Sequence, residues 1–281
     1  MRDRYIIVDK LGFGGYSTVW LARDKLKQRY VALKINIANF QSREAKILKT
    51  LSVPVSPNPI LRDGSVFLPK VLDEFRIDSP NGRHSCYAME VAGSDLREIS
   101  FSRLFSLEVS HALAYSLVLA VAYSHSLGIA RGDLHLRNMI LKLPSSLDSL
   151  SIDQFYAKYG KPELVEAIRC DGQPLPPGCP AKAVIPLSLS GPAESCTLNE
   201  AKLTLRDFGS AFSPAEQEHL GKDCHTPPPY RAPKATFEPD KPLYFASDIW
   251  SLATALWEII GMKAVFSTDY VSADEIIAQH V

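Results

Sequence analysis

An acid and an amide, Asp133 and Asn138, stand five positions apart in segment 131–138. A helix-like apolar run precedes this segment and the short apolar run 139–141 follows it, which predicts that both side chains lie on a loop. A carboxylate can orient a hydroxyl group and accept its proton, and an amide oxygen can hold a hard cation. The pair therefore suits phosphoryl transfer, although so short a motif also occurs by chance.

A second acid follows a strand-like run further along the chain. Residues 201–205 have the composition of a strand, and Asp207 comes shortly after them in an Asp-Phe-Gly triplet. A carboxylate at the end of a strand offers the hard oxygen that Mg²⁺ prefers. Because the triplet lies downstream of Asp133 and Asn138, we predict that Asp207 is a metal-binding carboxylate.

A glycine-rich turn at 12–15 lies between two strand-like runs, 5–8 and 18–22. Glycines let backbone N–H groups approach a phosphate closely, because no Cβ stands in the way. An ordinary hairpin turn is the simpler interpretation. The apolar run 31–35 makes the hairpin interpretation less favoured. It contains Lys34, and a lysine inside a buried strand requires an anion such as a phosphate.

The anion predicted for Lys34 is a nucleotide phosphate together with the carboxylate of Glu44. Glu44, Ile47, Leu48 and Leu51 recur at the spacing of one helix face. The alternative is that Glu44 is a solvated surface charge. The short distance in sequence from Lys34 implies that this helix is trimmed at its start.

The remaining elements are predicted from periodicity and composition. We expect strands at 66–68, 70–77 and 85–91, a long helix at 105–127, and a helix at 247–260 that is apolar nearly all round and therefore buried. Residues 54–59 form a proline-rich turn. His111 and His125, in the long helix, are expected to pack or face solvent and not to bind metal.

Residues 144–200 show little periodicity and are rich in proline, glycine and serine, so they are predicted to be an insertion. A short helix is expected at 152–167. Insertions of this composition are either flexible or partner-binding, and composition does not decide between them.

Overall composition excludes several classes of protein. The 281 residues are 46% hydrophobic and 22% charged, and 31 basic residues balance 31 acidic ones, so no net field attracts nucleic acid or an anionic membrane. The longest apolar run, 112–123, is shorter than a bilayer requires, and the first residues do not resemble a signal peptide. Five scattered cysteines favour reduced thiols over disulfides or zinc: Cys86, Cys170, Cys179, Cys196 and Cys224. We expect a cytoplasmic or nuclear monomer.

Taken in order, these motifs resemble a eukaryotic protein kinase, and the resemblance covers essentially the whole chain. Residues 10–24 and the Tyr230-Arg231 pair before Ala-Pro are most similar to the SR-protein kinase branch, especially its divergent fungal members. The resemblance implies an α+β, bilobal domain over 1–281. It implies an N-lobe at about 1–90 and a C-lobe at about 91–281 that carries the insertion.

The resemblance also implies roles for individual residues. Lys34 would bind the ATP phosphates and pair with Glu44, Asp133 would be the catalytic base, and Asn138 and Asp207 would hold Mg²⁺. Residues expected around the nucleotide are Gly12, Gly14, Gly15, Val19, Ala32, Met89 as gatekeeper, Glu90 and Ala92 at the hinge, and Ile140. An aspartate at the position of Asp248 bonds the backbone of the catalytic loop in this family. The implied substrate is a Ser or Thr hydroxyl on a protein, with Arg/Ser-rich sequences as one class.

Four positions depart from the family pattern. Arg131 stands in place of histidine, and Gly132 in place of the arginine that binds an activation-loop phosphate, so such regulation is not expected. His135 replaces a lysine that contacts the γ-phosphate, which predicts slower chemistry. Lys234 replaces a glutamate. The last helices of a standard C-lobe are also missing from the sequence, which predicts an uncovered apolar face and low stability of the isolated chain.

Two other functions stay open at this point. One is a pseudokinase or ATP-binding scaffold that acts by docking partners, which His135 and Lys234 favour. The other is a small-molecule phosphotransferase, because residues 132–135 also resemble the loop of aminoglycoside- and choline-type kinases. The Tyr-Arg-Ala-Pro segment and the helix that begins near Asp248 argue against the latter.

Overall fold

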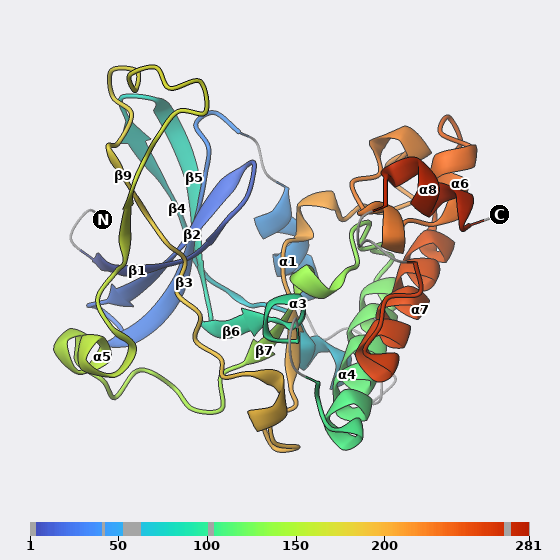
Figure 1. The fold of residues 1–281 in the computed structure, drawn as a ribbon, viewed down its shortest axis with the longest axis horizontal. Coiled ribbons are helices and arrows are strands. Elements are labelled where there is room, and N and C mark those ends of the chain that lie inside the picture. The colour runs from blue at the N-terminus through green and yellow to red at the C-terminus, as the bar shows by residue number, and fades with distance from the viewer. Residues whose placement is uncertain (1–3, 41–42, 53–62, 101–103, 267–270, 281) are drawn as a thin grey trace. The chain divides into compact units, whose positions relative to one another are not determined.

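The computed structural model describes residues 4–40, 43–52, 63–100, 104–266 and 271–280. The chain forms two compact units, each assembled from segments that are separated in the sequence. Unit 1 consists of Met1–Gln41, Val71–Val91 and Ser145–Leu189, and unit 2 of Ser42–Lys70, Ala92–Pro144 and Ser190–Val281. Unit 1 is built mainly from strands and unit 2 mainly from helices, which confirms the mixed α+β class (Figure 1).

A five-stranded antiparallel sheet forms the framework of unit 1, in the order β1-β2-β3-β5-β4 (Figure 1). Its strands are β1 (Tyr5–Phe13), β2 (Ser17–Asp24), β3 (Arg29–Asn36), β4 (Val71–Ser79) and β5 (Gly82–Met89). Val31, Leu33 and Ala88 are among the buried side chains that form its core. The strands predicted in these regions are confirmed. Several of them extend beyond their apolar stretches, because hydrogen bonds between neighbouring strands also pair the backbone N–H and C=O groups of the flanking residues.

The inserted segment of unit 1 packs on this sheet. It contains α5 (Ile152–Tyr159) and a hairpin of β8 (Leu164–Glu166) and β9 (Lys182–Val184). Phe155 of α5 is completely buried, and its ring centroid lies 5.6 Å from that of Tyr30 in β3. Asp148 Oδ1 accepts a hydrogen bond of 2.6 Å from the Tyr30 N–H. The insertion therefore packs against β3 of the same chain. Its composition had not indicated whether it would do so.

The predicted helix at 152–167 is correct at its start and wrong at its end. Ser151 begins α5 with a capping box that includes Gln154. The helix ends at Tyr159, because Gly160 adopts φ 88° and Pro162 follows. The residues after Pro162 form β8 instead.

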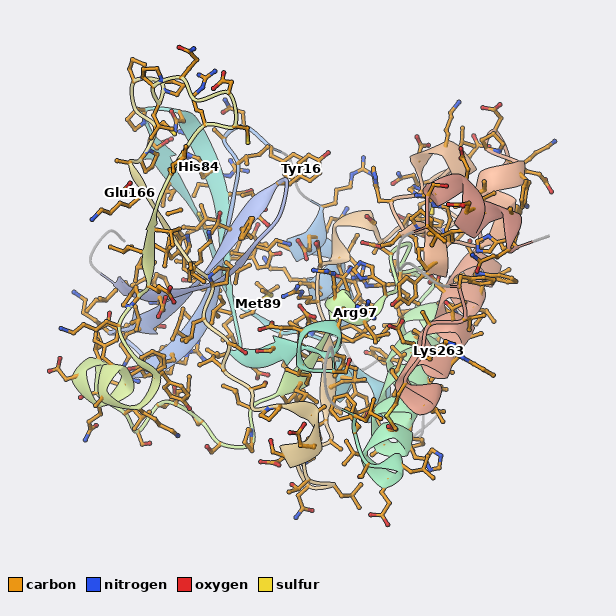
Figure 2. The ribbon with its side chains drawn as sticks, viewed as in Figure 1. Tyr16, His84, Met89, Arg97, Glu166 and Lys263 are labelled. Carbon is orange, nitrogen blue, oxygen red and sulfur yellow. The ribbon has the colours of Figure 1, made fainter. Side chains whose placement is uncertain are left out.

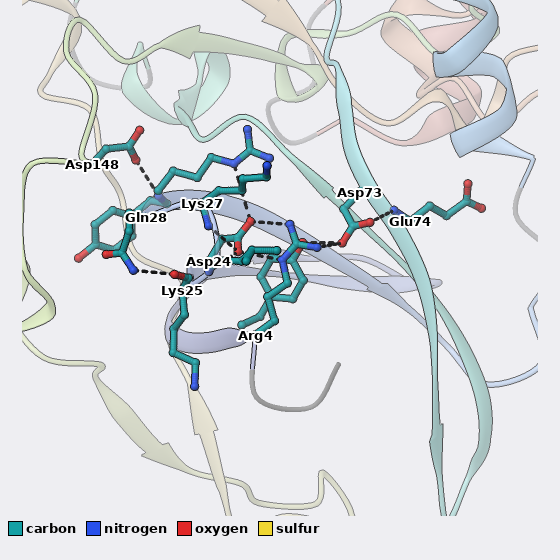
Figure 3. Close-up of polar contacts among 12 residues, drawn as sticks. Arg4, Asp24, Lys25, Lys27, Gln28, Asp73, Glu74 and Asp148 are labelled. Atoms are coloured by element: carbon teal, nitrogen blue, oxygen red, sulfur yellow. Dashed lines mark hydrogen bonds and ion pairs between the residues drawn. The ribbon is translucent and has the colours of Figure 1, made fainter.

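One arginine ties together three strands of unit 1 (Figure 3). Arg4, next to β1, donates to both carboxylate oxygens of Asp24, at 2.8 and 2.7 Å, and to Asp73 of β4 at 2.7 Å. Asp24 is fully buried and also accepts the N–H groups of Leu26 and Lys27 in the turn after β2. The hydrogen bonds from Arg4, opposed by burial, hold the pKa of Asp24 below its ordinary value.

Unit 2 contains a three-stranded sheet in the order β10-β7-β6 and a set of helices. The strands are β6 (Ala92–Asp95), β7 (Met139–Lys142) and β10 (Leu203–Leu205). The α-helices are α1 (Glu44–Leu51), α3 (Leu96–Ile99), α4 (Leu107–Ser126), α6 (Pro233–Phe237), α7 (Phe245–Gly261) and α8 (Ala273–Ala278). The 3₁₀ turns are η1 (Gly64–Phe67), η2 (Leu136–Asn138), η3 (Ala193–Ser195), η4 (Phe208–Ser210), η5 (Gly221–Asp223) and η6 (Pro228–Tyr230). Helices α4 and α7 pack against each other (Figure 1).

Several sequence predictions in unit 2 are confirmed and two are corrected. The long helix, the strands after it and before Asp207, and the helix near Asp248 are present. The strand predicted at 66–68 is wrong, because Gly64–Phe67 forms the 3₁₀ turn η1. Gly64, the first residue of this turn, packs closely against α4. A Cβ added to it would lie only 2.2 Å from the carbonyl oxygen of Leu119. The turn predicted at 54–59 lies outside the described residues.

Helix α7 is not buried all round, in contrast to the prediction. Ile249, Trp257 and Ile260 are 51%, 60% and 39% exposed, and their spacing places them on one face of the helix. The opposite face carries Asp248, Ser251, Leu252, Ala255 and Ile259, which are buried. The low stability expected for the isolated chain stays a prediction.

Helix α4 has the length and hydropathy of a helix that could cross a membrane, but 61% of its most apolar window is buried inside the protein. Its buried side chains include Leu113, Leu117 and Tyr123. The Tyr123 hydroxyl donates to the carbonyl of Leu51 at the end of α1, at 2.9 Å. This packing is that of a core helix.

We predict that Asp24→Asn lowers the free energy of unfolding by about 2–3 kcal/mol at pH 7, because it removes the charge that the hydrogen bonds from Arg4 require. The pKa of Asp24 is lowered in the folded state. Its contribution is therefore fully present above the unfolded pKa of about 3.9 and is lost as pH falls through the lower folded value. Urea unfolding at pH 7 and near pH 3 should show a difference from wild type that shrinks in acid. Asp240→Asn, in the exposed pair with Lys222, serves as control and should leave stability nearly unchanged, because water and salt screen an exposed pair. A difference independent of pH would contradict this account.

Truncation of Phe155 tests the packing of the insertion. Phe155→Ala should lower the free energy of unfolding by about 3–4 kcal/mol, because a fully buried ring is replaced by a cavity. Val165→Ala, in the same inserted segment but 41% exposed, should cost less than about 1 kcal/mol. Equal and small effects in both variants would show that the insertion is not packed as described.

Candidate active site

Segment 131–138 lies between α4 and β7, as predicted, and is fixed at its start by two backbone hydrogen bonds. Ala130 N–H donates to Phe212 O at 2.8 Å, and Phe212 N–H donates to Ala130 O at 2.9 Å. Phe212 belongs to the stretch that follows Asp207. The two segments that carry the candidate acids are therefore joined directly within unit 2.

A buried carboxylate in the first turn of α7 accepts hydrogen bonds from the backbone of this loop. Asp248, 2% exposed, accepts the N–H of Arg131 at 2.5 Å and the N–H of Gly132 at 2.8 Å. His125 of α4 places Nε2 at 2.8 Å from the same carboxylate. The role that the resemblance implied for Asp248 is confirmed. His125 is a packing and hydrogen-bonding residue here, with its ring 4.7 Å from that of Phe245.

Gly132 allows a close approach that no other residue permits. It adopts φ 71°, and an added Cβ would lie 2.4 Å from the carbonyl oxygen of Ser210. Its own carbonyl accepts the Thr226 hydroxyl at 2.9 Å. Gly132 departs from the family pattern, and the close contact with Ser210 explains why this chain requires glycine at the position.

Asp133, His135 and Asn138 form one hydrogen-bonded cluster. Asn138 Nδ2 lies 3.1 Å from Asp133 Oδ2 and 3.0 Å from His135 Nε2, and His135 Nε2 lies 3.4 Å from Asp133 Oδ1. The side chains of Asp133 and His135 are 16% and 11% exposed, so both still reach solvent. The cluster presents a carboxylate, an imidazole and an amide within a few ångströms of one another.

Opposing influences set the pKa of Asp133. Burial raises the pKa, the contact with His135 and the charges of His135 and Arg131 lower it, and the nearby Asp207 carboxylate raises it. The net result is a pKa below the ordinary value. Asp133 is therefore ionised at neutral pH and available to accept a hydrogen bond from a hydroxyl group.

Strand pairing brings Asn138 and Asp207 to the same edge of the small sheet. Leu205 of β10 pairs with Met139 of β7, and Arg206 N–H donates to Asn138 O at 2.9 Å. Asp207 is the next residue and is exposed. Two carboxylates close enough to affect each other's ionisation, beside an amide, form a donor set of oxygens that suits Mg²⁺. Among the described residues there is no group of three or more His, Cys, Asp or Glu side chains that could hold a metal ion.

Unit 1 gathers other candidates on one face of its sheet. Val19 pairs with Lys34 in register, and Ala32 pairs with Met89 at the end of β5. Directly opposed residues and residues two apart share a face, so these four side chains point the same way. Lys34 is 7% exposed, and its Nζ lies 5.9 Å from the centroid of the Tyr87 ring.

The glycine-rich turn joins β1 and β2, with Gly14 N–H donating to Ser17 O at 2.9 Å. An added Cβ would meet nothing within 4 Å at Gly12, Gly14 or Gly15, and none of the three has a positive φ. The packing of the protein itself therefore does not require glycine at these positions. The roles of these glycines, and of Glu90, Ala92 and Ile140, stay predictions.

Glu44 is 2% exposed, so the alternative of a solvated surface charge is wrong. Its Oε1 accepts the N–H of Phe208 at 2.7 Å within unit 2. Lys34 belongs to unit 1, and the Lys34–Glu44 pair stays a prediction. The bond to Phe208 was not foreseen.

A second polar cluster near the loop was missed by the sequence analysis. The Tyr230 hydroxyl donates to the carboxylate of Glu258, which also accepts Arg97 Nη1 at 2.8 Å; Figure 2 labels Arg97 on α3. The Tyr230 ring lies 6.0 Å from the ring of His135. Burial and the Glu258 charge raise the pKa of Tyr230. A glutamate inside the apolar helix α7 was the available signal, because a buried carboxylate requires partners.

Comparison with known proteins finds partial matches to protein kinases. The chain is 43% identical over 90 residues to a serine/threonine protein kinase of Aspergillus fumigatus, which covers 32% of this chain and 22% of the relative. It is 33% identical over 144 residues to protein kinase dsk1 of Schizosaccharomyces pombe, covering 49% and 26%. It is 39% identical over 100 residues to human SRSF protein kinase 3, covering 33% and 17%. No protein-family model matches the chain.

These relatives are serine/threonine kinases of the SR-protein kinase branch, at modest identity, and the resemblance seen in the motifs is confirmed to that extent. The matched part spans about a quarter or less of each relative's length. The β-rich first part and helical later part are consistent with the fold of such kinases.

Two glycines with positive φ offer a matched test of the loop geometry. Gly132→Ala should destabilise the protein by several kcal/mol, on the order of 3 or more, because Cβ would collide with the Ser210 backbone as well as adopt the left-handed region. Gly128→Ala, at φ 76° with nothing within 4 Å, should cost about 1 kcal/mol. Thermal unfolding measures both. Equal losses would contradict the close approach of Gly132 to Ser210.

Proposed function

We propose that this relative of the SR-protein kinases is an ATP-dependent protein kinase that transfers the γ-phosphoryl group to a Ser or Thr hydroxyl. The observation that carries the proposal is the cluster of Asp133 and Asn138, which β7–β10 pairing brings next to Asp207. These residue types in this order suit phosphoryl transfer. The names of the relatives support the same reaction class.

Asp133 orients the substrate hydroxyl and accepts its proton as the bond to phosphorus forms. Its lowered pKa keeps it ionised and ready to accept a hydrogen bond. Asn138 and Asp207 hold Mg²⁺, which supplies neutralisation of phosphate charge when bound. Most of the catalysis then consists of positioning and electrostatic stabilisation.

On the nucleotide side, Lys34 contacts the phosphates and pairs with Glu44. Its burial in a strand supports this role, because a buried ammonium group requires anions. The turn that contains Gly12, Gly14 and Gly15 approaches the phosphates through backbone N–H groups, and its glycines are not demanded by the fold. The adenine lies against Val19, Ala32, Met89 and Ile140 and bonds the backbone of Glu90 and Ala92.

The proposed substrates are proteins rich in Arg and Ser. This class rests on the resemblance and on the human relative, which is named as a kinase of SRSF proteins. We also propose one kinase domain over 1–281, with the lobes at about 1–90 and 91–281, acting as a monomer in the cytoplasm or nucleus.

One observation favours a second function, that of an ATP-binding pseudokinase. His135, at the position of a phosphate-binding lysine, is engaged with Asn138 and Asp133. A lysine carries a flexible ammonium group that can reach a phosphate, whereas the His135 ring is held in these contacts. In this case ATP would bind without being turned over.

We predict that purified protein with Mg²⁺-ATP phosphorylates an Arg-Ser repeat peptide, and that Asp133→Asn lowers kcat by about 10²–10⁴-fold, because the proton acceptor is lost. Transfer of labelled phosphate to the peptide is the measurement. Lys34→Met should weaken ATP binding, which tests the phosphate contact separately.

Three results would redirect the assignment. Tight ATP binding without turnover supports the pseudokinase. Turnover only with small alcohols supports a small-molecule phosphotransferase. Full peptide phosphorylation by Asp133→Asn would overturn the role given to Asp133.

A further inference from the structure

Two exposed aromatic side chains stack on each other beside the glycine-rich turn. Tyr16 directly precedes β2, and Figure 2 labels it at the tip of the β1–β2 hairpin. Its ring centroid lies 5.1 Å from that of Phe40, and the two ring planes are 18° apart. Rings at this distance and angle attract each other. Tyr16 and Phe40 are 60% and 37% exposed, so the stack is a contact at the surface of unit 1 and not part of its core.

The backbone brings the two rings together. Ser17 pairs with Asn36 in the β2–β3 ladder, and one residue further on the N–H of Ile37 donates to the carbonyl of Tyr16 at 2.9 Å. The chain then turns, because the N–H of Phe40 donates to the carbonyl of Ile37 at 3.4 Å. This turn after β3 returns the Phe40 ring to the ring of Tyr16.

Asn39 anchors the turn after β3 to the β4–β5 hairpin. It adopts φ 60°, in the left-handed region, which asparagine tolerates better than most residues. Its N–H donates to the carbonyl of Arg83 at 2.8 Å, and its Oδ1 accepts the N–H of Arg83 at 3.4 Å. Gly82 leaves room for this side chain, because a Cβ added there would lie 2.8 Å from Asn39 Nδ2. The turn is thus fixed to the sheet on one side and contacts Tyr16 on the other.

The glycine-rich turn itself is packed loosely. A Cβ added at Gly12, Gly14 or Gly15 would meet nothing within 4 Å, so neighbouring structure does not hold the turn at these positions. Glycine also loses more conformational freedom on ordering than any other residue. A turn of this composition therefore depends on contacts at its ends, and the ring of Tyr16 provides one.

We propose that Asn39 and Phe40 form a bracket that positions the glycine-rich turn through the ring of Tyr16. The bracket orders the turn before a nucleotide arrives, so less conformational entropy is lost when the backbone N–H groups of the turn bind phosphates. These three residues are positioning residues, because they act through the backbone of the turn. The consequence for nucleotide binding rests on the function proposed above, whereas the bracket itself concerns the protein without nucleotide.

Five variants separate the stack from the anchor. Tyr16→Ala and Phe40→Ala each remove the stack, and Tyr16→Phe keeps it. Asn39→Gly preserves the positive φ and removes the side-chain bond to Arg83, so it weakens the anchor without changing either ring. Tyr115→Ala is the matched control, because Tyr115 is 61% exposed and lies on α4 in unit 2. The rings that are removed are exposed, so these variants should fold as the wild type does.

Amide hydrogen exchange of the full chain, detected by NMR, tests the bracket without nucleotide. The amides of Gly14 and Ile37, which are hydrogen-bonded at the turn, should exchange about threefold to tenfold faster in both alanine variants of the stack. The double alanine variant should show no larger effect than either single one, because the two rings share one contact. Asn39→Gly should give a smaller increase, and Tyr16→Phe and the control should match wild type. Unchanged exchange in both single variants, or effects that multiply in the double variant, would overturn the bracket.

Nucleotide assays then test the consequence for ATP. The KM for ATP should rise about threefold to tenfold in Tyr16→Ala and in Phe40→Ala, with kcat changed by less than about twofold, because the turn binds phosphates equally in the ground and transition states. Tyr16→Phe should restore the wild-type KM. An unchanged or lower KM in both alanine variants would show that the bracket does not prepare the turn for nucleotide. Absence of turnover in wild type would overturn the proposed function and leave the exchange result as the test of the bracket.

Discussion

The buried carboxylate of Asp248 is the interaction on which the candidate site depends. A loop of irregular backbone leaves N–H groups that must find acceptors, and Asp248 supplies them to Arg131 and Gly132 in consecutive peptides. Because Asp248 lies in the first turn of α7 and also contacts His125 of α4, the two long helices and the loop share one anchor. Asp133 follows directly after the anchored residues, so its position is set by the packing of helices and depends little on the loop itself.

Strand pairing then sets the second half of the site. β7 and β10 are far apart in the sequence, yet their pairing places Asn138 beside Arg206 and Asp207 one residue further on. The chain between them can be long because the entropy of closing a loop grows slowly with its length. Much of that chain is itself ordered, with Phe155 buried against Tyr30 in unit 1. A long insertion rich in proline, glycine and serine is thereby compatible with the pairing of β7 and β10.

Local patterns predicted the elements that position the site, and long-range contacts escaped prediction. The apolar stretches around Lys34, in α4 and before Asp207 were sufficient, because each matches the period of its element. The strand predicted at 66–68 failed because tertiary packing on α4 selected a tight turn, and α5 ended early at Gly160. Contacts such as Tyr230 with Glu258, or Arg131 with Phe208, join segments whose proximity no local pattern encodes. The bonds of Asp248 to the loop backbone are also long-range, and they were anticipated through the family resemblance.

The central claim is that Asn138 and Asp207 form a magnesium site for a nucleotide, and the dependence of ATP affinity on Mg²⁺ tests it most directly. Titration calorimetry of the full chain with ATP, with Mg²⁺ or with EDTA, should show affinity that is at least about tenfold tighter with the ion. Asp207→Asn should abolish that difference, because a neutral amide replaces a carboxylate ligand. An affinity that is equal with and without Mg²⁺, or a Mg²⁺ effect that survives Asp207→Asn, would contradict the account.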